Sequence, residues 1–271
     1  MTVLVVGASG YLGRSVVDAF AARGVDSLGT YYSNPIEGAT RRYDFFADDP
    51  ADLPLDAVES VVFAAHVERT DHDFETFAAA AERFVAAVRS AGPRLVYTSS
   101  AGVFDGSGSR YDEATPATPK SKYGRRLRRF ERFVAAHDDS SVLRADYLFG
   151  RSRGSLDRRL ARTRRLVREG RRVPYYADMW KSPCHVREAG RALAVLAGSD
   201  VQGVVHAPTP RTSAWAFHRA GMAALGERPR LVVPEPMPDD PTLHRDTSLS
   251  SSRFERVCGF RPRSVVRALR G

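Results

Sequence analysis

Cysteine is scarce in this sequence: its 271 residues include two, Cys184 and Cys258. Two cysteines so far apart build neither a disulfide framework nor a cysteine-ligated metal centre, so we expect no bound metal and a reducing, cytoplasmic location. Runs of about 18 apolar residues are also missing, which argues against a membrane-spanning helix. The first residues lack the basic and apolar pattern of a secretory signal, so we expect no leader.

Lysine is nearly as scarce, since only three of the 41 basic residues are lysines. Arginine therefore carries most of the formal net charge of +9, and ten arginines fall within residues 151–172. Such a stripe can attract nucleic acid, bind phosphorylated or carboxylated substrates, or form a solvated helix face. No nucleic-acid recognition motif accompanies it. We therefore expect a small-molecule substrate, phosphorylated or nucleotide-linked, and neither a nucleic-acid nor a membrane partner.

Short apolar runs alternate with helical patterns along the first 150 residues. Strands separated by helices predict a parallel sheet with helices on both faces, so the predicted fold is α/β, a doubly wound sheet of the Rossmann type. The strands are predicted at residues 2–6, 27–31, 43–46, 60–65, 94–100 and 141–145, and the helices at 12–23, 76–91 and 121–137.

The alternation becomes looser after Gly150. We expect residues 1–150 to form a dinucleotide-binding core, and residues 151–271 to form mainly a substrate-binding lobe with some segments returning to the core. In the second part, helices are predicted at 155–168 and 214–225, a strand at 204–206, an extended segment at 231–238, and a short helix at the end of 249–270.

A glycine-rich turn links the first predicted strand to the first helix. Gly7 permits the tight turn, Gly10 lets a pyrophosphate approach the backbone, and Gly13 allows helix and strand to pack closely. The helix N-terminus adds free N–H groups and a partial positive charge. The turn predicts a bound nicotinamide dinucleotide, held by Gly7, Ser9, Gly10, Tyr11, Leu12 and Gly13.

The end of the second predicted strand carries Tyr31 where an NAD-binding chain would have a carboxylate. Ser33 could donate a hydrogen bond to a 2′-phosphate, and Arg41 or Arg42 could pair with it, so NADP is favoured over NAD. The remaining cofactor contacts are expected from Asp44, which could bond the adenine or be an ordinary turn carboxylate, and from Phe45, Ala64, Ala65, His66 and Ser99.

Several segments, taken in order, resemble an extended short-chain dehydrogenase/reductase, most closely the dTDP-4-dehydrorhamnose reductase group. The resemblance implies an NAD(P)H-dependent reductase of a carbonyl on a nucleotide-sugar or a related polar metabolite; members of the family often form homodimers. The similar segments are Gly7–Gly13, Tyr97–Gly106, Tyr111–Pro119, Tyr123–Glu131, Arg144–Gly150, Trp180–Val186 and Asp246–Ser252.

In that family a Ser or Thr orients the substrate carbonyl, a Tyr transfers the proton, and a Lys four residues later lowers the Tyr pKa. Ser100 and Tyr123 match the first two roles. Position 127, however, is leucine, and Phe77 stands near the position of a family Asn.

Three alternatives follow from Leu127. Arg126, three residues after Tyr123, could supply the cation, although an arginine stays protonated and cannot relay a proton. The site could instead carry non-redox or atypical chemistry. In the third alternative the protein binds a dinucleotide without turnover, in a regulatory role.

Phe104, Trp180 and Cys184 fall where the family lines its substrate cleft, and Arg211 is a further candidate for the substrate. Phe104 and Trp180 could stack on a ring, and Arg211 could bind a phosphate. Cys184 could be a reactive thiol. The structural alternatives, core packing for the first two and a solvated surface for the arginine, remain open.

Overall fold

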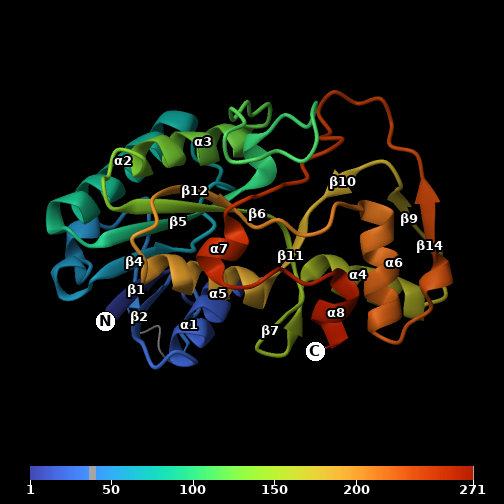
Figure 1. Ribbon diagram of the computed structural model, residues 1–271, viewed down its shortest axis with the longest axis horizontal. Helices are drawn as coiled ribbons and strands as arrows, with labels where there is room; N and C mark the ends of the chain where they lie inside the picture. Colours follow the sequence, from blue (N-terminus) through green and yellow to red (C-terminus); the bar gives the residue numbers. More distant parts are fainter. Residues whose placement is uncertain (37–40, 271) are drawn as a thin grey trace.

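An eight-stranded, wholly parallel sheet organises the N-terminal part of the chain in the computed structural model, which describes residues 1–36 and 41–270 (Figure 1). The strand order is β11-β6-β5-β4-β1-β2-β3, and β12 also pairs with β6. The predicted doubly wound α/β fold is therefore confirmed. The bounds are β1 (Thr2–Val6), β2 (Asp26–Tyr31), β3 (Arg41–Arg42), β4 (Ser60–Phe63), β5 (Arg94–Ser100), β6 (Ser140–Phe149), β11 (Pro183–His185) and β12 (Gly203–His206).

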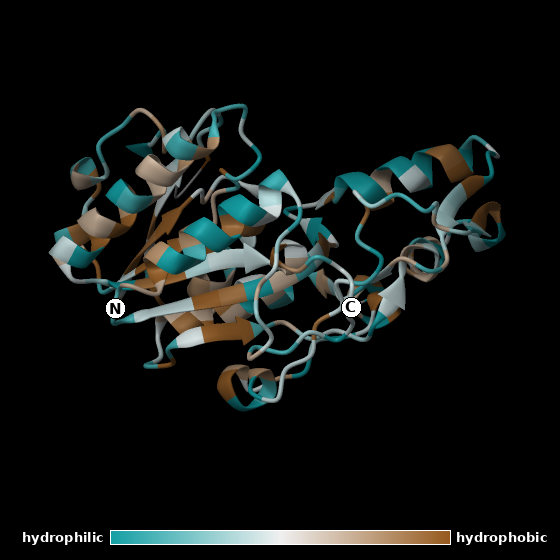
Figure 2. Ribbon diagram, turned by 90° about the horizontal axis from the view of Figure 1, so that it is seen from above, coloured by the Kyte–Doolittle hydropathy of each residue, from teal (hydrophilic) through white to brown (hydrophobic). Residues whose placement is uncertain are grey.

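Helices cover both faces of this sheet, because alternate strand residues point to opposite sides. Leu4 and Val6 of β1 pack toward α2 (Phe74–Ala91) and α3 (Lys122–Val134), whereas Val3 and Val5 pack toward α1 (Tyr11–Ala21) and α5 (Val186–Ala197). Figure 1 shows the first helix pair above the sheet and the second pair below it. In Figure 2 the strands are largely hydrophobic, while the helices carry both kinds of residue.

A smaller unit lies beyond the carboxyl ends of the strands (Figure 1). It has its own hydrophobic core, which includes Phe149, Leu160, Val173 and Phe217. Its elements are β7 (Arg151–Ser152), β8 (Ser155–Leu156), α4 (Arg158–Arg168), β9 (Val173–Tyr176), β10 (Trp180–Lys181), β13 (Thr212–Ser213), α6 (Ala214–Ala224), β14 (Val232–Glu235) and α8 (Val265–Arg270).

The chain after Gly150 also returns to the larger unit. β11 and β12 pair with β6, α5 covers the sheet, and α7 (Phe254–Cys258) packs on α5. We therefore propose that the boundary near Gly150 separates a core from a lobe, and that these later segments belong to the core. No helix in the described residues is long and apolar enough to cross a membrane.

Three sequence predictions need correction. The strand predicted at 43–46 is β3 at Arg41–Arg42, because Asp44 begins a turn by accepting a hydrogen bond from the backbone of Phe46 at 3.0 Å. The helix predicted from Ser155 begins at Arg158, where Asp157 caps it. Helix α5 was not predicted, although its buried Val186, Ala189, Leu193 and Leu196 have helical spacing.

Candidate functional site

The candidate residues meet at the carboxyl edge of the sheet, which is where ligands bind in open parallel α/β folds. Gly7 follows β1, His66 lies after β4, and Ser100 ends β5. Asp146 and Tyr147 lie near the end of β6, next to the smaller unit. Four neighbouring strands thus bring these residues to the same edge of the sheet.

The glycine turn has the geometry that the sequence predicts. Gly7 has a φ of +83°, and a Cβ there would lie 2.7 Å from the Cα of Ala65. A Cβ on Gly13 would lie 2.1 Å from the carbonyl oxygen of Gly7. Gly10 stands at the N-terminal cap of α1 with no side chain to occupy the first-turn N–H groups. These features fit a dinucleotide pyrophosphate.

The other residues of this turn hold the strand–helix junction together. Tyr11 donates from its hydroxyl to the carbonyl oxygen of Gly150 at 3.0 Å. The carbonyl of Ser9 accepts from Nε of Arg14 at 2.9 Å, and Leu12 is buried. On the neighbouring strand, the N–H of Ala64 donates to Val6 at 2.9 Å.

Basic side chains lie beside the end of β2, because β3 pairs with Thr30 and Tyr31. The guanidinium of Arg42 lies 5.6 Å from the ring centroid of Tyr32, and it pairs with Asp44 at 3.7 Å. Ser33, also at this end, is exposed.

Phe45 was expected to contact the cofactor, but its side chain lies in the core. It is 5% exposed, and its ring packs against Phe63 and Phe130 in the core. Ser99, another expected contact, donates from its buried hydroxyl to Glu131 at 2.6 Å. The side chains of both residues are therefore buried in the interior of the protein.

Ser100 and Tyr123 come together as the family pattern requires. Burial raises the pKa of Tyr123 and the Glu68 carboxylate adds to the rise, whereas a hydrogen bond with Ser100 opposes it. Tyr123 lies against Gly102, where a Cβ would be 3.0 Å from the ring. The ring of His66 meets Tyr123 edge-on at 5.8 Å. The phenol is therefore protonated at neutral pH.

Arg126 does not supply the missing cation, which corrects the sequence hypothesis. Its guanidinium donates to the carbonyl oxygens of Glu68 at 3.0 Å and Thr70 at 2.8 Å, and also to that of His72. Because these bonds engage both of its terminal nitrogens, Arg126 fixes the loop between β4 and α2.

The cation next to Tyr123 is Arg69, from the loop that Arg126 holds. Its guanidinium carbon lies 4.6 Å from the centroid of the Tyr123 ring, and its charge lowers the pKa of Tyr123. Within the described parts of the chain, Arg69 forms no ion pair. Partial desolvation, and then the charges of Arg69 and Arg159, lower the pKa of His66.

The same loop carries an acid that the sequence reasoning missed. Glu68 is 2% exposed and accepts a hydrogen bond from the hydroxyl of the fully buried Tyr97. Burial raises the pKa of Glu68 to about 7. Where the family has lysine and Asn, Leu127 is 1% exposed and Phe77 is fully buried, so both positions are part of the apolar core.

On the substrate side, Trp180 and Arg211 form one assembly. The Arg211 guanidinium lies 3.7 Å from the Trp180 ring, and its Nε donates to Asp246 at 2.8 Å. Nearby, Lys181 donates to Thr247 at 2.8 Å. Trp180 and Arg211 are thus stacked, and Asp246 pairs with the guanidinium.

Phe104 and Cys184 are placed differently from this pair. Phe104 is fully buried and stacks on Tyr111 at 4.1 Å, and Cys184 is 1% exposed. Burial raises the pKa of the Cys184 thiol far above its usual range, which leaves no reactive thiolate. The structure corrects both expectations because each side chain packs in the interior.

Arg159 lies in the first turn of α4, in the smaller unit. It stacks over the Tyr147 ring at 4.2 Å, and its charge lowers the pKa of both His66 and His218. Tyr147 has a φ of +46°, which is unusual for a non-glycine residue, and its hydroxyl is 3.2 Å from Nε2 of His218.

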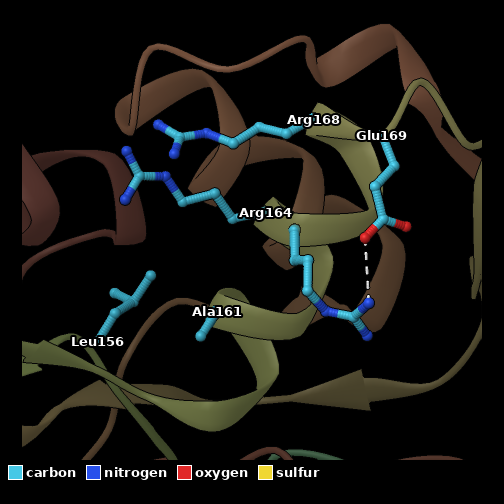
Figure 3. A pocket seen from close by; sticks show the side chains of 6 residues that line it. Leu156, Ala161, Arg164, Arg168 and Glu169 are labelled. Atoms are coloured by element: carbon cyan, nitrogen blue, oxygen red, sulfur yellow. Dashed lines mark hydrogen bonds and ion pairs between the residues drawn. The ribbon is translucent and has the colours of Figure 1, made fainter.

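Three other arginines of the arginine-rich stretch pair with carboxylates of the smaller unit. Arg164 and Arg168 both donate to Glu227 at 2.7 Å, and Arg165 pairs with Glu169 at 3.1 Å. Figure 3 shows Arg164, Arg168 and Glu169 among the side chains that line a pocket on α4. Carboxylates of the same unit thus balance part of the charge.

The chain was compared with known proteins. A family model described as "RmlD substrate binding domain" matches residues 1–270. A curated relative, methionine adenosyltransferase 2 subunit beta from Danio rerio, is 33% identical over 163 residues. That match covers 55% of this chain and 48% of the relative, so it spans about half of that protein.

Solved structures of similar fold cover nearly the whole chain. A hypothetical dTDP-4-dehydrorhamnose reductase from Sulfolobus tokodaii superposes with a TM-score of 0.80 at 24% identity, over 95% of this chain and 94% of the other. The dTDP-4-dehydrorhamnose reductase from Bacillus anthracis, in complex with NADP, gives 0.77 at 20% identity, over 99% and 96%. At these identities the matches demonstrate the fold, and together with the family match they show that this chain belongs to the RmlD substrate-binding domain family.

Proposed function

We propose that this protein is an NADP-dependent reductase of a carbonyl group on a nucleotide-linked sugar or a related polar metabolite. The observation that carries the proposal is the pairing of Ser100 with Tyr123 at the sheet edge that also holds the glycine turn. Family membership supports it, as do the names of the structural neighbours, two of which are dTDP-4-dehydrorhamnose reductases.

In this proposal the protein binds the cofactor, orients the substrate and supplies the proton. A bound nicotinamide dinucleotide would supply the hydride. Gly7, Gly10 and Gly13 would hold its pyrophosphate. Ser100 would orient the substrate carbonyl, and the Tyr123 hydroxyl would donate a proton to the carbonyl oxygen. Arg69, the cation over the Tyr123 ring, would favour the phenolate that this donation leaves.

A preference for NADP over NAD rests on the end of β2. Tyr31 stands there in place of a carboxylate, and Arg42 lies close by, so a 2′-phosphate could compete with Asp44 and Asp48 for the Arg42 guanidinium. We expect Arg42→Ala to weaken NADPH binding about tenfold and to leave NADH binding within about twofold. Fluorescence titration with both nucleotides, with the exposed Arg89→Ala as control, tests this preference.

The substrate would lie between the Ser100–Tyr123 pair and the Trp180–Arg211 assembly. A nucleotide-linked sugar contains a base and a phosphate. The Trp180 ring could stack on the base, and the Arg211 guanidinium could bind the phosphate. We also propose a cytoplasmic location, which agrees with two free, buried cysteines. Pairing of two copies is a further proposal, and sedimentation velocity would test it.

The central experiment measures NADPH oxidation with dTDP-4-keto-sugars and other keto-sugar nucleotides. Tyr123→Phe removes the proton donor, so we expect kcat to fall by about 10²–10⁴ while NADPH binding is retained. Tyr176→Phe, which alters a tyrosine of β9, is the matched control. Unchanged turnover in Tyr123→Phe would contradict the assignment of the donor.

A second candidate function is that of a dinucleotide-binding subunit without redox turnover. It is favoured by Leu127, which removes the usual lysine, and by the similarity to a protein named as a subunit of methionine adenosyltransferase. The two candidates differ in the same assay. NADPH binding with no reduction of any keto-sugar nucleotide would favour the subunit.

A further inference from the structure

The first turn of α4 holds the backbone of Arg159 in a defined place beside the end of β6. Asp157 caps this helix, and its carboxylate accepts from the N–H groups of Arg159 at 3.1 Å and Leu160 at 3.0 Å. The same carboxylate accepts from the N–H of Gly150, the residue after β6, at 3.1 Å. The start of α4 is therefore tied to the strand that leads into the smaller unit.

The side chain of Arg159 lies on a tyrosine that is itself fixed. Its guanidinium carbon is 4.2 Å from the centroid of the Tyr147 ring. The Tyr147 hydroxyl is 3.2 Å from Nε2 of the fully buried His218, and Nδ1 of His218 is 2.9 Å from the Thr163 hydroxyl. That hydroxyl also donates to the backbone carbonyl of Arg159 at 2.9 Å. The guanidinium is thus positioned in advance, so less conformational entropy is lost when it binds a ligand.

The guanidinium of Arg159 is exposed and has no acidic partner among residues 1–36 and 41–270. Arg164, on the same helix, by contrast donates to Glu227 at 2.7 Å. Burial raises the pKa of Asp146 and Asp157, which the charge of Arg159 opposes, and both acids accept hydrogen bonds from backbone N–H groups. Arg159 therefore offers a cation with planar N–H donors, which suits a carboxylate or a phosphate.

This cation lies near the pair that would hold the substrate carbonyl. Ala145 of β6 is the register partner of Ser100, and Tyr147 follows two residues later. Two strand residues span roughly 7 Å, so the guanidinium over Tyr147 is on the order of 10 Å from Ser100. Burial, and then the charges of two arginines including Arg159, lower the pKa of His66, which follows β4 at the same edge of the sheet. An anion at Arg159 would therefore lie at the carbonyl-bearing end of the substrate.

We propose that Arg159 binds an anionic oxygen group, a carboxylate or a phosphate, on the carbonyl-bearing unit of the substrate. This inference rests on the proposed reductase function, and it narrows the substrate to one whose reacting unit carries an acid or a phosphate. The dinucleotide pyrophosphate belongs to the glycine turn, at the start of α1. Arg159 is a specificity-determining residue, because it holds the substrate equally before and during the reaction and so acts on KM more than on kcat.

Binding of substrate analogues tests this without turnover. Glucose and glucuronate, each linked to dTDP or to UDP, differ by one carboxylate on the sugar, and calorimetry in the presence of NADP⁺ measures their Kd. If Arg159 binds the carboxylate, the glucuronate forms bind about tenfold tighter than the glucose forms, and Arg159→Met removes this difference. If it binds the phosphate, both forms bind equally, and Arg159→Met weakens both about tenfold to hundredfold. Arg158→Met, at the neighbouring exposed arginine, leaves every Kd within about twofold.

The outcomes separate this inference from the proposed function. The role of Arg159 is overturned if Arg159→Met leaves the Kd of every analogue unchanged, if it weakens NADPH binding as much as analogue binding, or if the wild type binds none of the analogues. Binding that depends on Arg159, without reduction of any keto-sugar nucleotide, supports the anion site and overturns the reductase proposal. With a substrate that is reduced, Arg159→Met raises KM about tenfold or more and leaves kcat within about twofold, and Arg159→Lys recovers part of the affinity.

Discussion

Two glutamates of this protein are equally buried, at 2% exposure, and have opposite surroundings. Glu131 accepts from Nε and Nη2 of Arg144 at 2.8 and 2.7 Å, and from the Ser99 hydroxyl. Glu68 accepts from a neutral tyrosine, and it forms no ion pair within the described residues. Equal burial therefore accompanies two different arrangements: Glu131 belongs to a buried ion pair, whereas Glu68 has a neutral hydrogen-bond partner and a pKa that burial raises.

Removing Glu131, the glutamate with an ion pair, should have the largest effect on stability. Glu131→Ala leaves Arg144 buried without its counter-charge, so we expect the free energy of unfolding to fall by about 3–5 kcal/mol. Urea unfolding followed by circular dichroism measures this. The double variant Glu131→Ala/Arg144→Met should recover much of the loss, and a loss below about 1 kcal/mol in the single variant would contradict the comparison.

Glu68, which has no ion pair within the described residues, should make the unfolding free energy depend on pH. The pKa of Glu68 is raised from 4.5 to about 7 on folding, so its contribution to stability is complete below pH 4.5 and lost as the pH rises through 7. Between pH 4.5 and 8, the difference in unfolding free energy between wild type and Glu68→Gln should change by about 3 kcal/mol. A constant difference would show that Glu68 is ionised throughout.

Arg126 tests whether the loop needs its anchor. Arg126→Met removes the hydrogen bonds to the carbonyls of Glu68, Thr70 and His72, and should lower the unfolding free energy by about 2 kcal/mol. Faster amide hydrogen exchange across residues 66–73 should accompany this loss. Arg126→Lys keeps the charge but loses the planar guanidinium, so its unfolding free energy should lie between those of the wild type and Arg126→Met. Unchanged exchange would mean that the loop is held by other contacts.

The smallest effect is expected at the exposed Arg69. Arg69→Leu should change the unfolding free energy by less than about 0.5 kcal/mol, since an exposed charge contributes little. It should nevertheless move the Glu68 titration to slightly higher pH, because the Arg69 charge lowers the Glu68 pKa. An infrared titration would detect this, and a shift to lower pH would contradict the assigned electrostatics.

The sheet and the glycine turn could be predicted because their signals are local. Buried strands such as Thr2–Val6 are continuous apolar runs, and the glycines have spacing that the turn itself requires. Ser100 and Tyr123 could be predicted from the family pattern. The same comparison with the family pattern identified Leu127 at the position of the usual lysine.

Glu68 and Arg69 could not be predicted in this way, since they lie in a loop without periodicity and act on residues far along the chain. Spacing on the helix favoured Arg126 as the cation, but a long side chain reaches past its neighbours, and here it reaches the carbonyls of another segment. Similarly, the burial of Phe104 and Cys184 depends on how later segments fold back onto the sheet.

Gly150 lies where the chain first passes from the larger unit to the smaller one. Its carbonyl accepts from the hydroxyl of Tyr11, at the start of α1, and its N–H donates at 3.1 Å to Asp157, which caps α4. A Cβ at this position would lie 2.3 Å from Nε2 of His185, so no other residue fits without rearrangement. Gly150 therefore ties the first turn of α1, which follows the glycine turn, to the residue that caps α4.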